Sequence, residues 1–217
     1  MRDLAPLVGR RLDESTVDLI VERMYPAVAS GQTYSRRLAR QYYTDMVAEH
    51  VLGEPAPAPP PGNYDRPALR NGLVRVLLPD GKTPVTAGTL GRALAVGGKH
   101  ILDSGRREMM ATVLHDERFS GWARSDPSPP TCAFCTMLIS RGAVYRSQET
   151  AGAMNQWHTH CSCQAVPVVN GVWEGRNQYE AADRLWRESA GHTDQLNTFR
   201  RTVGHADIPA AHAAMAN

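Results

Sequence analysis

The chain has 217 residues, of which 42% are hydrophobic, and a formal net charge of +2. This length suffices for one sizeable core or two small ones, and the apolar content is ordinary for a globular protein. No apolar run approaches the roughly 18 residues that a membrane-spanning helix needs, so the composition excludes a helical membrane protein. The small net charge neither favours nor excludes a nucleic-acid partner.

The N-terminal residues 1–52 are predicted to form a helical hairpin. A capping-box-like start at Ser15 opens the first helix, and Pro26 is expected to kink or end it. A second helix is predicted over residues 33–52. Its large apolar residues recur every four positions and so share one helical face: Tyr34, Leu38, Tyr42 and Met46.

Three arginines, Arg36, Arg37 and Arg40, lie on the other faces of this second helix. The guanidinium group suits bidentate contact with phosphate or carboxylate. We expect a solvated surface here, with contact to DNA or to a partner protein as the alternative.

Residues 53–67 are rich in proline and are predicted to be a stiff, extended linker. After it, the alternation of Val74, Val76 and Leu78 predicts a short strand, followed by a turn at residues 79–81.

A long helix is predicted over residues 86–116, and its glycines suggest close helix packing or a hinge. A last helix is predicted over residues 177–203, with Gly191 as a point where it splits. Its expected buried residues are Tyr179, Leu185, Leu196 and Phe199. The alanine-rich tail from Ile208 is expected to fray or to bind a neighbour.

Four cysteines in two close pairs carry the chemistry of the chain. Cys132 and Cys135 form a C-x-x-C, and residues 158–163 form an H-x-x-C-x-C. Zinc takes four nitrogen or sulfur ligands in a tetrahedron, so this pattern predicts one structural zinc ion. The preferred ligands are Cys132, Cys135, His158 and Cys161; Cys163 can replace Cys161 or His158, and His160 is a spare ligand.

Three other interpretations of the cysteines stay open. A redox C-x-x-C normally opens a helix within a thioredoxin-like unit, and no βαβ pattern surrounds this one. A pair of disulfides would suit a secreted domain, but the polar start of the chain does not read as a signal peptide. Reduced cysteines can also pack simply as small hydrophobes.

A β-hairpin is predicted directly after the cysteines, with strands at residues 166–169 and 172–173 joined by a tight turn at Asn170-Gly171. Zinc would pin this hairpin to the C-x-x-C loop and replace a hydrophobic core. The predicted fold class is therefore mainly α (α+β): long helices with a small zinc-stabilised β element near residues 130–175.

The motif region resembles a known family. The resemblance rests on the run Trp122-Ala123-Arg124, the C-x-x-C within residues 131–138, the segment 141–145, and the run from Trp157 to Val168. These residues are similar to those of the phage Mu F-like head morphogenesis family, or minor capsid proteins, in the version carried by tailed phages of actinobacteria. The match covers roughly residues 118–175 and assigns residues 68–217 to a Mu F-like domain.

The resemblance implies a viral protein that enters the procapsid in low copy number during virion assembly. Its implied partners are the portal protein, the major capsid or scaffold protein, and the packaged DNA, with neither a membrane nor a small-molecule substrate. Its implied location is the virion, inside the capsid, and the bacterial host cytoplasm during assembly. The arginine-rich second helix and the C-terminal helix are the first places to look for these contacts.

We expect no enzymatic activity. Five or six candidate ligands for four places favour a closed structural ion, whereas a catalytic zinc keeps one position open. No G-x-S-x-G, P-loop or H-E-x-x-H motif occurs in the sequence. The alternative is a zinc-knuckle enzyme such as an HNH-type nuclease, with His158 or His160 on a catalytic metal; a capsid maturation protease is a weaker alternative.

Overall fold

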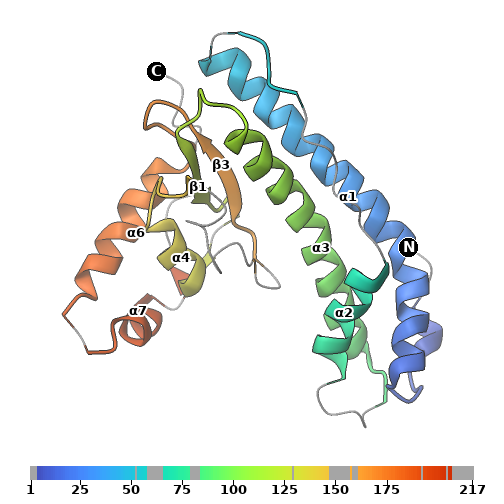
Figure 1. Ribbon diagram of the computed structural model, residues 1–217. Helices are drawn as coiled ribbons and strands as arrows, with labels where there is room; N and C mark the ends of the chain where they lie inside the picture. The colour runs from blue at the N-terminus through green and yellow to red at the C-terminus, as the bar shows by residue number, and fades with distance from the viewer. Residues whose placement is uncertain are drawn as a thin grey trace. The chain divides into compact units, whose positions relative to one another are not determined.

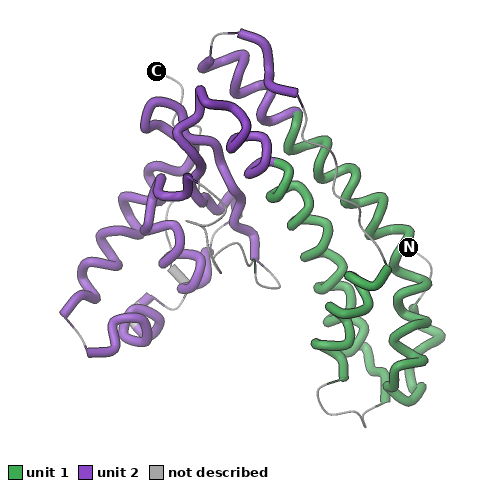
Figure 2. The backbone as a smooth tube through the Cα atoms, in the orientation of Figure 1, with its two compact units in different colours: residues 1–40, 60–108, 157–160 green, residues 41–59, 109–156, 161–217 purple. Residues whose placement is uncertain are grey.

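The computed structural model describes residues 4–51, 53–57, 66–78, 84–128, 130–146, 157, 161–191, 193–203 and 205–206. The chain divides into two compact units (Figure 2): unit 1 holds residues 1–40, 60–108 and 157–160, and unit 2 holds residues 41–59, 109–156 and 161–217. The described residues are mainly helical, with a small antiparallel sheet (Figure 1), which confirms the predicted fold class.

Unit 1 is built from the first part of α1 (Glu14–His50), from α2 (Arg66–Leu77) and from most of α3 (Ala87–Leu114). These helices pack their apolar faces together, and a short 3-10 helix, η1 (Ala5–Leu7), adds to the same core. The buried residues that form the core include Leu7, Leu12, Val17, Ile20, Met24, Val28, Leu69, Leu73, Leu77, Val85, Ala93 and Val96.

The predicted N-terminal hairpin is wrong, because α1 is one helix of 37 residues with Pro26 inside it. Proline removes one backbone hydrogen bond from a helix interior. Here buried residues flank it on both sides, with Met24 at 2% and Val28 at 4% exposure, so packing outweighs the lost bond.

The predicted apolar face of residues 34–46 is also wrong at its start. Tyr34 is 63% exposed and Leu38 is 51% exposed, whereas Met46 is buried. A four-residue repeat drifts around a helix that has about 3.6 residues per turn, so the two ends of the series face different sides.

The predicted strand around residues 74–78 is wrong, because residues 74–77 are the end of α2 and residue 78 follows it. The helical period is carried by Leu69, Leu73 and Leu77, which are at most 3% exposed. Val74 and Val76 are only partly buried against that core. Their strand-like spacing of two residues therefore does not reflect how this segment packs.

The long helix predicted over residues 86–116 is confirmed by α3, and its glycines allow close helix packing. A Cβ at position 97 would lie 2.8 Å from the Met24 Cε of α1. A Cβ at position 105 would lie 2.9 Å from the backbone oxygen of Ser35. The helices therefore meet at these two positions with no room for a side chain.

Unit 2 contains the sheet. Strand β1 (Gly121–Ser125) pairs antiparallel with β3 (Gln164–Val168), so that Trp122 lies opposite Pro167 and Arg124 opposite Ala165. A second, shorter pair joins β2 (Thr131–Cys132) to β4 (His205–Ala206). Among its described residues, unit 2 also contains α4 (Ala133–Ile139), α6 (Arg176–Glu188), α7 (Gln195–Val203) and the ends of α1 and α3.

The tight turn after β3 is confirmed. Asn170 and Gly171 have φ angles of 50° and 76°, as a type I′ turn requires. The flanking residues exchange two backbone hydrogen bonds, Val169 N–H to Val172 O at 2.9 Å and Val172 N–H to Val169 O at 2.8 Å. However, the main partner of β3 is β1, which the sequence did not predict as a strand.

The C-terminal helix splits at Gly191, as predicted, because this residue has a φ of +88° between α6 and α7. Phe199 is fully buried and meets the Trp186 ring edge-on at 5.1 Å. Leu196 is 36% exposed, so its predicted burial is wrong. Most of the predicted linker (residues 58–65) and the tail from residue 208 lie outside the described residues.

Gly121 starts β1 in a conformation that side chains disfavour. Its φ is +131°, and a Cβ there would lie 2.3 Å from the Tyr145 backbone oxygen, which accepts a hydrogen bond from Trp122 N–H. We expect Gly121→Ala to lower the free energy of unfolding by about 2 kcal/mol or more, measured by urea denaturation. Gly171→Ala is the control, because its φ is also positive but nothing lies within 4 Å of the added Cβ. Equal losses in the two variants would contradict the steric argument.

A buried carboxylate in unit 2 makes stability depend on pH. Asp116 accepts hydrogen bonds from Tyr43 Oη at 2.5 Å and from Arg118 Nη2 at 2.7 Å and Nε at 2.8 Å. The Arg118 guanidinium, helped by Tyr43 and opposed by burial, lowers the pKa of Asp116 to about 2. Because the folded pKa lies below the unfolded value of about 3.9, this contribution is complete above that value and is lost as the pH falls toward 2.

Asp116→Asn is therefore expected to cost about 2 kcal/mol at neutral pH and to flatten the loss of stability between pH 5 and 2. Urea unfolding at a series of pH values measures both effects. Asp183→Asn is the control, because it breaks a partly exposed pair with Arg187, whose side chain is 75% exposed, and should change little at any pH. A D116N variant that keeps the wild-type pH profile would contradict the assignment.

Candidate metal centre

The first two cysteines sit where β2 turns into α4. Cys132 ends the strand and caps the helix: its Sγ accepts a hydrogen bond from the Cys135 backbone N–H at 3.4 Å. This short turn places Cys135 in the first turn of the helix, with its thiol on the same side as that of Cys132. A backbone N–H that points at sulfur favours the thiolate, which is the form that binds metal.

The second pair directly precedes β3, and the pairing of β3 with β1 fixes its position. Cys135 Sγ lies 3.4 Å from Cys161 Sγ, and the sulfurs of Cys135, Cys161 and Cys163 all lie within 4.8 Å of one another. Sulfurs around tetrahedral zinc, with bonds of about 2.3 Å, lie about 3.8 Å apart, so the spacing fits one ion. Cys135, Cys161 and Cys163 are each at most 4% exposed.

Neighbouring thiols and burial raise the pKa values of Cys135 and Cys163, so these two thiols hold their protons tightly. The pKa of Cys135 is raised because its side chain hydrogen-bonds with Cys132, Cys161 and Cys163, and burial adds to the shift. Such a thiol is a poor nucleophile at neutral pH. A divalent cation displaces these protons, which is how a crowded group of buried thiols becomes a binding site.

The structure brings together three of the predicted metal residues and sets a fourth, Cys132, against Cys135. The other two candidates, His158 and His160, lie outside the described residues. None of the four cysteines, all of which are described, forms a disulfide. The C-x-x-C opens a helix as a redox motif does, but β1 and β3 are antiparallel and two further thiols surround Cys135.

From the sequence alone, the polar residues around the cysteines have no predicted role in the site, although Arg124 and Tyr145 belong to the segments that carry the resemblance. Arg124 and Asp126, at the end of β1, are each only 1% exposed. Gln178 of α6 clamps the backbone of Asp126: it accepts from Asp126 N–H at 2.8 Å and donates to Asp126 O at 2.7 Å. Tyr145 stacks on Trp122 with ring centroids 4.3 Å apart. Their closeness to the cysteines follows from the tertiary structure, since β1 carries no clear alternation that would predict it.

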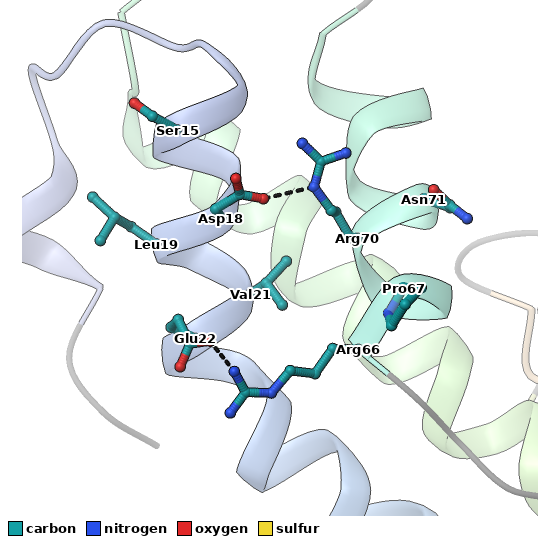
Figure 3. A pocket seen from close by; sticks show the side chains of 9 residues that line it. All are labelled: Ser15, Asp18, Leu19, Val21, Glu22, Arg66, Pro67, Arg70 and Asn71. Carbon is teal, nitrogen blue, oxygen red and sulfur yellow. Dashed lines mark hydrogen bonds and ion pairs between the residues drawn. The ribbon is translucent and has the colours of Figure 1, made fainter.

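Apart from the cysteine cluster of unit 2, the structure has a groove of about 540 Å³ in unit 1, between α1 and α2 (Figure 3). Its charges pair across the two helices: Arg70 with Glu14 at 2.9 Å and with Asp18 at 2.6 Å, and Arg66 with Glu22. These exposed pairs link α2 to α1 and leave the groove with matched charges, so it is a weaker candidate for a functional site than the cysteine cluster.

Among the described residues, no helix has both the length and the apolar character that crossing a membrane requires. The sequence model of the VG15 protein family matches residues 1–189, which is most of the chain and includes all four cysteines. The chain belongs to the VG15 protein family.

Two relatives of this VG15 protein are curated phage proteins. The Gene 15 protein of Mycobacterium phage D29 is 30% identical over 125 residues, covering 43% of this chain and 46% of the relative. The Gene 15 protein of Mycobacterium phage L5 is 28% identical over 167 residues, covering 51% of this chain and 57% of the relative. The chain thus spans about half the length of these relatives, and no solved structure matches it.

Proposed function

We propose that this protein is a minor capsid or head morphogenesis protein whose unit 2 is stabilised by one structural zinc ion. The observation that carries the zinc is the group of buried sulfurs from Cys135, Cys161 and Cys163, with Cys132 against it. The proposed ligands are these four cysteines, which makes Cys163 the replacement for His158. Bound zinc would join the α4 turn to the start of β3 without catalysing a reaction.

The head role is supported by two observations on the sequence. The chain is similar to the Gene 15 proteins of two mycobacteriophages, and the residues around the cysteines resemble those of the Mu F-like minor capsid proteins. We propose assembly inside the procapsid, near the portal, the scaffold or major capsid protein and the DNA, with the host cytoplasm as the site of synthesis. Neither a membrane nor a small-molecule substrate is part of this proposal.

The zinc is tested by elemental analysis of protein purified under reducing conditions, repeated after treatment with a chelator. We expect about one zinc per chain, and loss of the folded state of unit 2 when zinc is removed. Four titratable thiols and no metal would refute the zinc site and leave the head role resting on the family and the resemblance.

The head role is tested in particles assembled from the genome that encodes the protein. Mass spectrometry of purified procapsids and mature virions should find the chain in both, in low copy number. Deleting its gene should reduce the yield of particles that contain DNA. Its absence from every particle, together with normal head yield, would refute the role.

A non-enzymatic role is separated from the nuclease alternative by one further assay. The purified zinc-loaded protein, given Mg²⁺ and plasmid DNA, should leave the DNA intact. If cleavage occurs, His160→Ala should abolish it while sparing the fold, and that outcome would establish the zinc-knuckle nuclease in place of the structural protein.

A further inference from the structure

A fully buried guanidinium lies beside the proposed metal centre. Arg124 is 1% exposed, and the largest influence on its pKa is burial, which lowers it. The charges that favour its protonated form belong to Tyr145 and to the thiols of Cys163, Cys161 and Cys135. Burying a cation is costly unless it is compensated by a nearby negative charge.

The strand pairing explains why Arg124 faces the cysteines. Arg124 lies directly opposite Ala165 in the antiparallel sheet. Cys163 comes two residues before Ala165, and side chains two residues apart in an extended chain share a face. Arg124 and Cys163 are therefore diagonal neighbours on one face of the sheet, within reach of a long side chain.

The other charges near this face are negative, so they favour a positively charged side chain such as that of Arg124 beside the proposed metal. Four thiolates around one divalent cation leave a net double negative charge. Asp126, which is also buried, adds a carboxylate whose charge acts on Cys163. One oxygen of Asp126 accepts a hydrogen bond from the Ser128 backbone N–H at 3.0 Å.

We propose that Arg124 is a positioning residue of the metal centre, whose buried positive charge offsets the negative charge of the metal–thiolate group. This inference rests on the proposed zinc site. It assigns to β1, which contributes no ligand, a direct effect on metal affinity. Tyr145 also contacts the arginine, because its hydroxyl interacts with the guanidinium, and its ring stacks on Trp122 of the same strand as the arginine.

The test compares Arg124→Gln with Arg124→Lys in the full chain. Both substitutions keep a polar group, and only lysine keeps the charge. Zinc affinity is measured by competition with a chromophoric chelator under reducing conditions. We expect the glutamine variant to bind zinc about 10- to 100-fold more weakly than the wild type, and lysine to restore most of the affinity.

Arg141→Met is the matched control. Arg141 is exposed and also interacts with Tyr145, whereas Arg124 is buried and its pKa is influenced by the thiols of Cys163, Cys161 and Cys135. The Arg141→Met variant should bind zinc as tightly as the wild type. A loss of zinc affinity equal to that of Arg124→Gln would mean that the contact with Tyr145, and not the charge of Arg124, causes the effect, and it would overturn the proposal.

The remaining outcomes are also decisive. Equal zinc affinity in Arg124→Gln and wild type would overturn the role of Arg124 while leaving the zinc site intact. A wild type that binds no zinc would instead overturn the metal centre itself. If the glutamine variant does not fold, the lysine variant decides: a folded protein with near wild-type affinity supports the charge argument, and a folded protein that has lost zinc overturns it.

Discussion

Cys163→Ser is expected to abolish tight zinc binding and to unfold the region of unit 2 around β3 and α4. Cys163 is fully buried, and its sulfur lies within 4.8 Å of two other thiols. A structural zinc in a small domain contributes apparent binding energies of about 10 kcal/mol, so a three-sulfur site should lose several kcal/mol of stability. Elemental analysis and thermal unfolding followed by circular dichroism measure the two effects.

Ser162→Ala is the control for this variant. Ser162 lies between two of the cysteines, and its backbone oxygen, which the substitution keeps, accepts a hydrogen bond from Gln164. It should retain one zinc and wild-type stability. A Cys163→Ser protein that keeps both its metal and its melting temperature would remove Cys163 from the ligand set and return His158 to it.

Asp103→Ala is expected to cost about 3–5 kcal/mol in unit 1, because it leaves a buried guanidinium without its carboxylate. The Arg106 side chain is 0% exposed, and its Nη1 donates to Asp103 Oδ1 at 2.9 Å. The guanidinium also lies 4.3 Å from the centre of the Trp157 ring, and Lys99 pairs with the same carboxylate. Urea denaturation measures the loss.

Two further variants test the explanation for this loss. Asp103→Leu combined with Arg106→Met removes both charges and should recover much of the stability, since apolar replacements of a buried pair are often neutral. Glu22→Ala breaks an exposed pair with Arg66 and should cost less than about 1 kcal/mol. Equal costs for Glu22→Ala and Asp103→Ala would show that burial of the pair does not matter.

Helical periodicity predicted the fold class and the long helix α3, but it misplaced elements where two periods overlap. Residues 74–78 alternate like a strand while Leu69, Leu73 and Leu77 repeat like a helix, and burial of the leucines decides the outcome. Pro26 is expected from the sequence to kink or end the first helix, because the local cost of a proline in a helix is clear. The core packing that outweighs this cost depends on residues of α2 and α3 far along the chain.

The candidate site was likewise predicted from the sequence only in part. Cys132, Cys135, Cys161 and Cys163 could be singled out because metal ligands come in short, recognisable spacings. The role of Arg124 could not be predicted, although the resemblance includes this residue, since a single arginine in a five-residue segment is ordinary until the register with β3 places it near Cys163. Which residues of two strands lie opposite one another cannot be seen from the sequence pattern of either strand alone.

Because the cysteines differ in burial, we also expect their thiols to react with oxidants in a fixed order. Cys132 is partly accessible to solvent, whereas Cys135, Cys161 and Cys163 are enclosed. Sulfenic acid forms where thiolate character and access coincide, so peroxide should attack Cys132 first. In air we therefore expect oxidation of the protein to begin at Cys132, ahead of the three enclosed thiols.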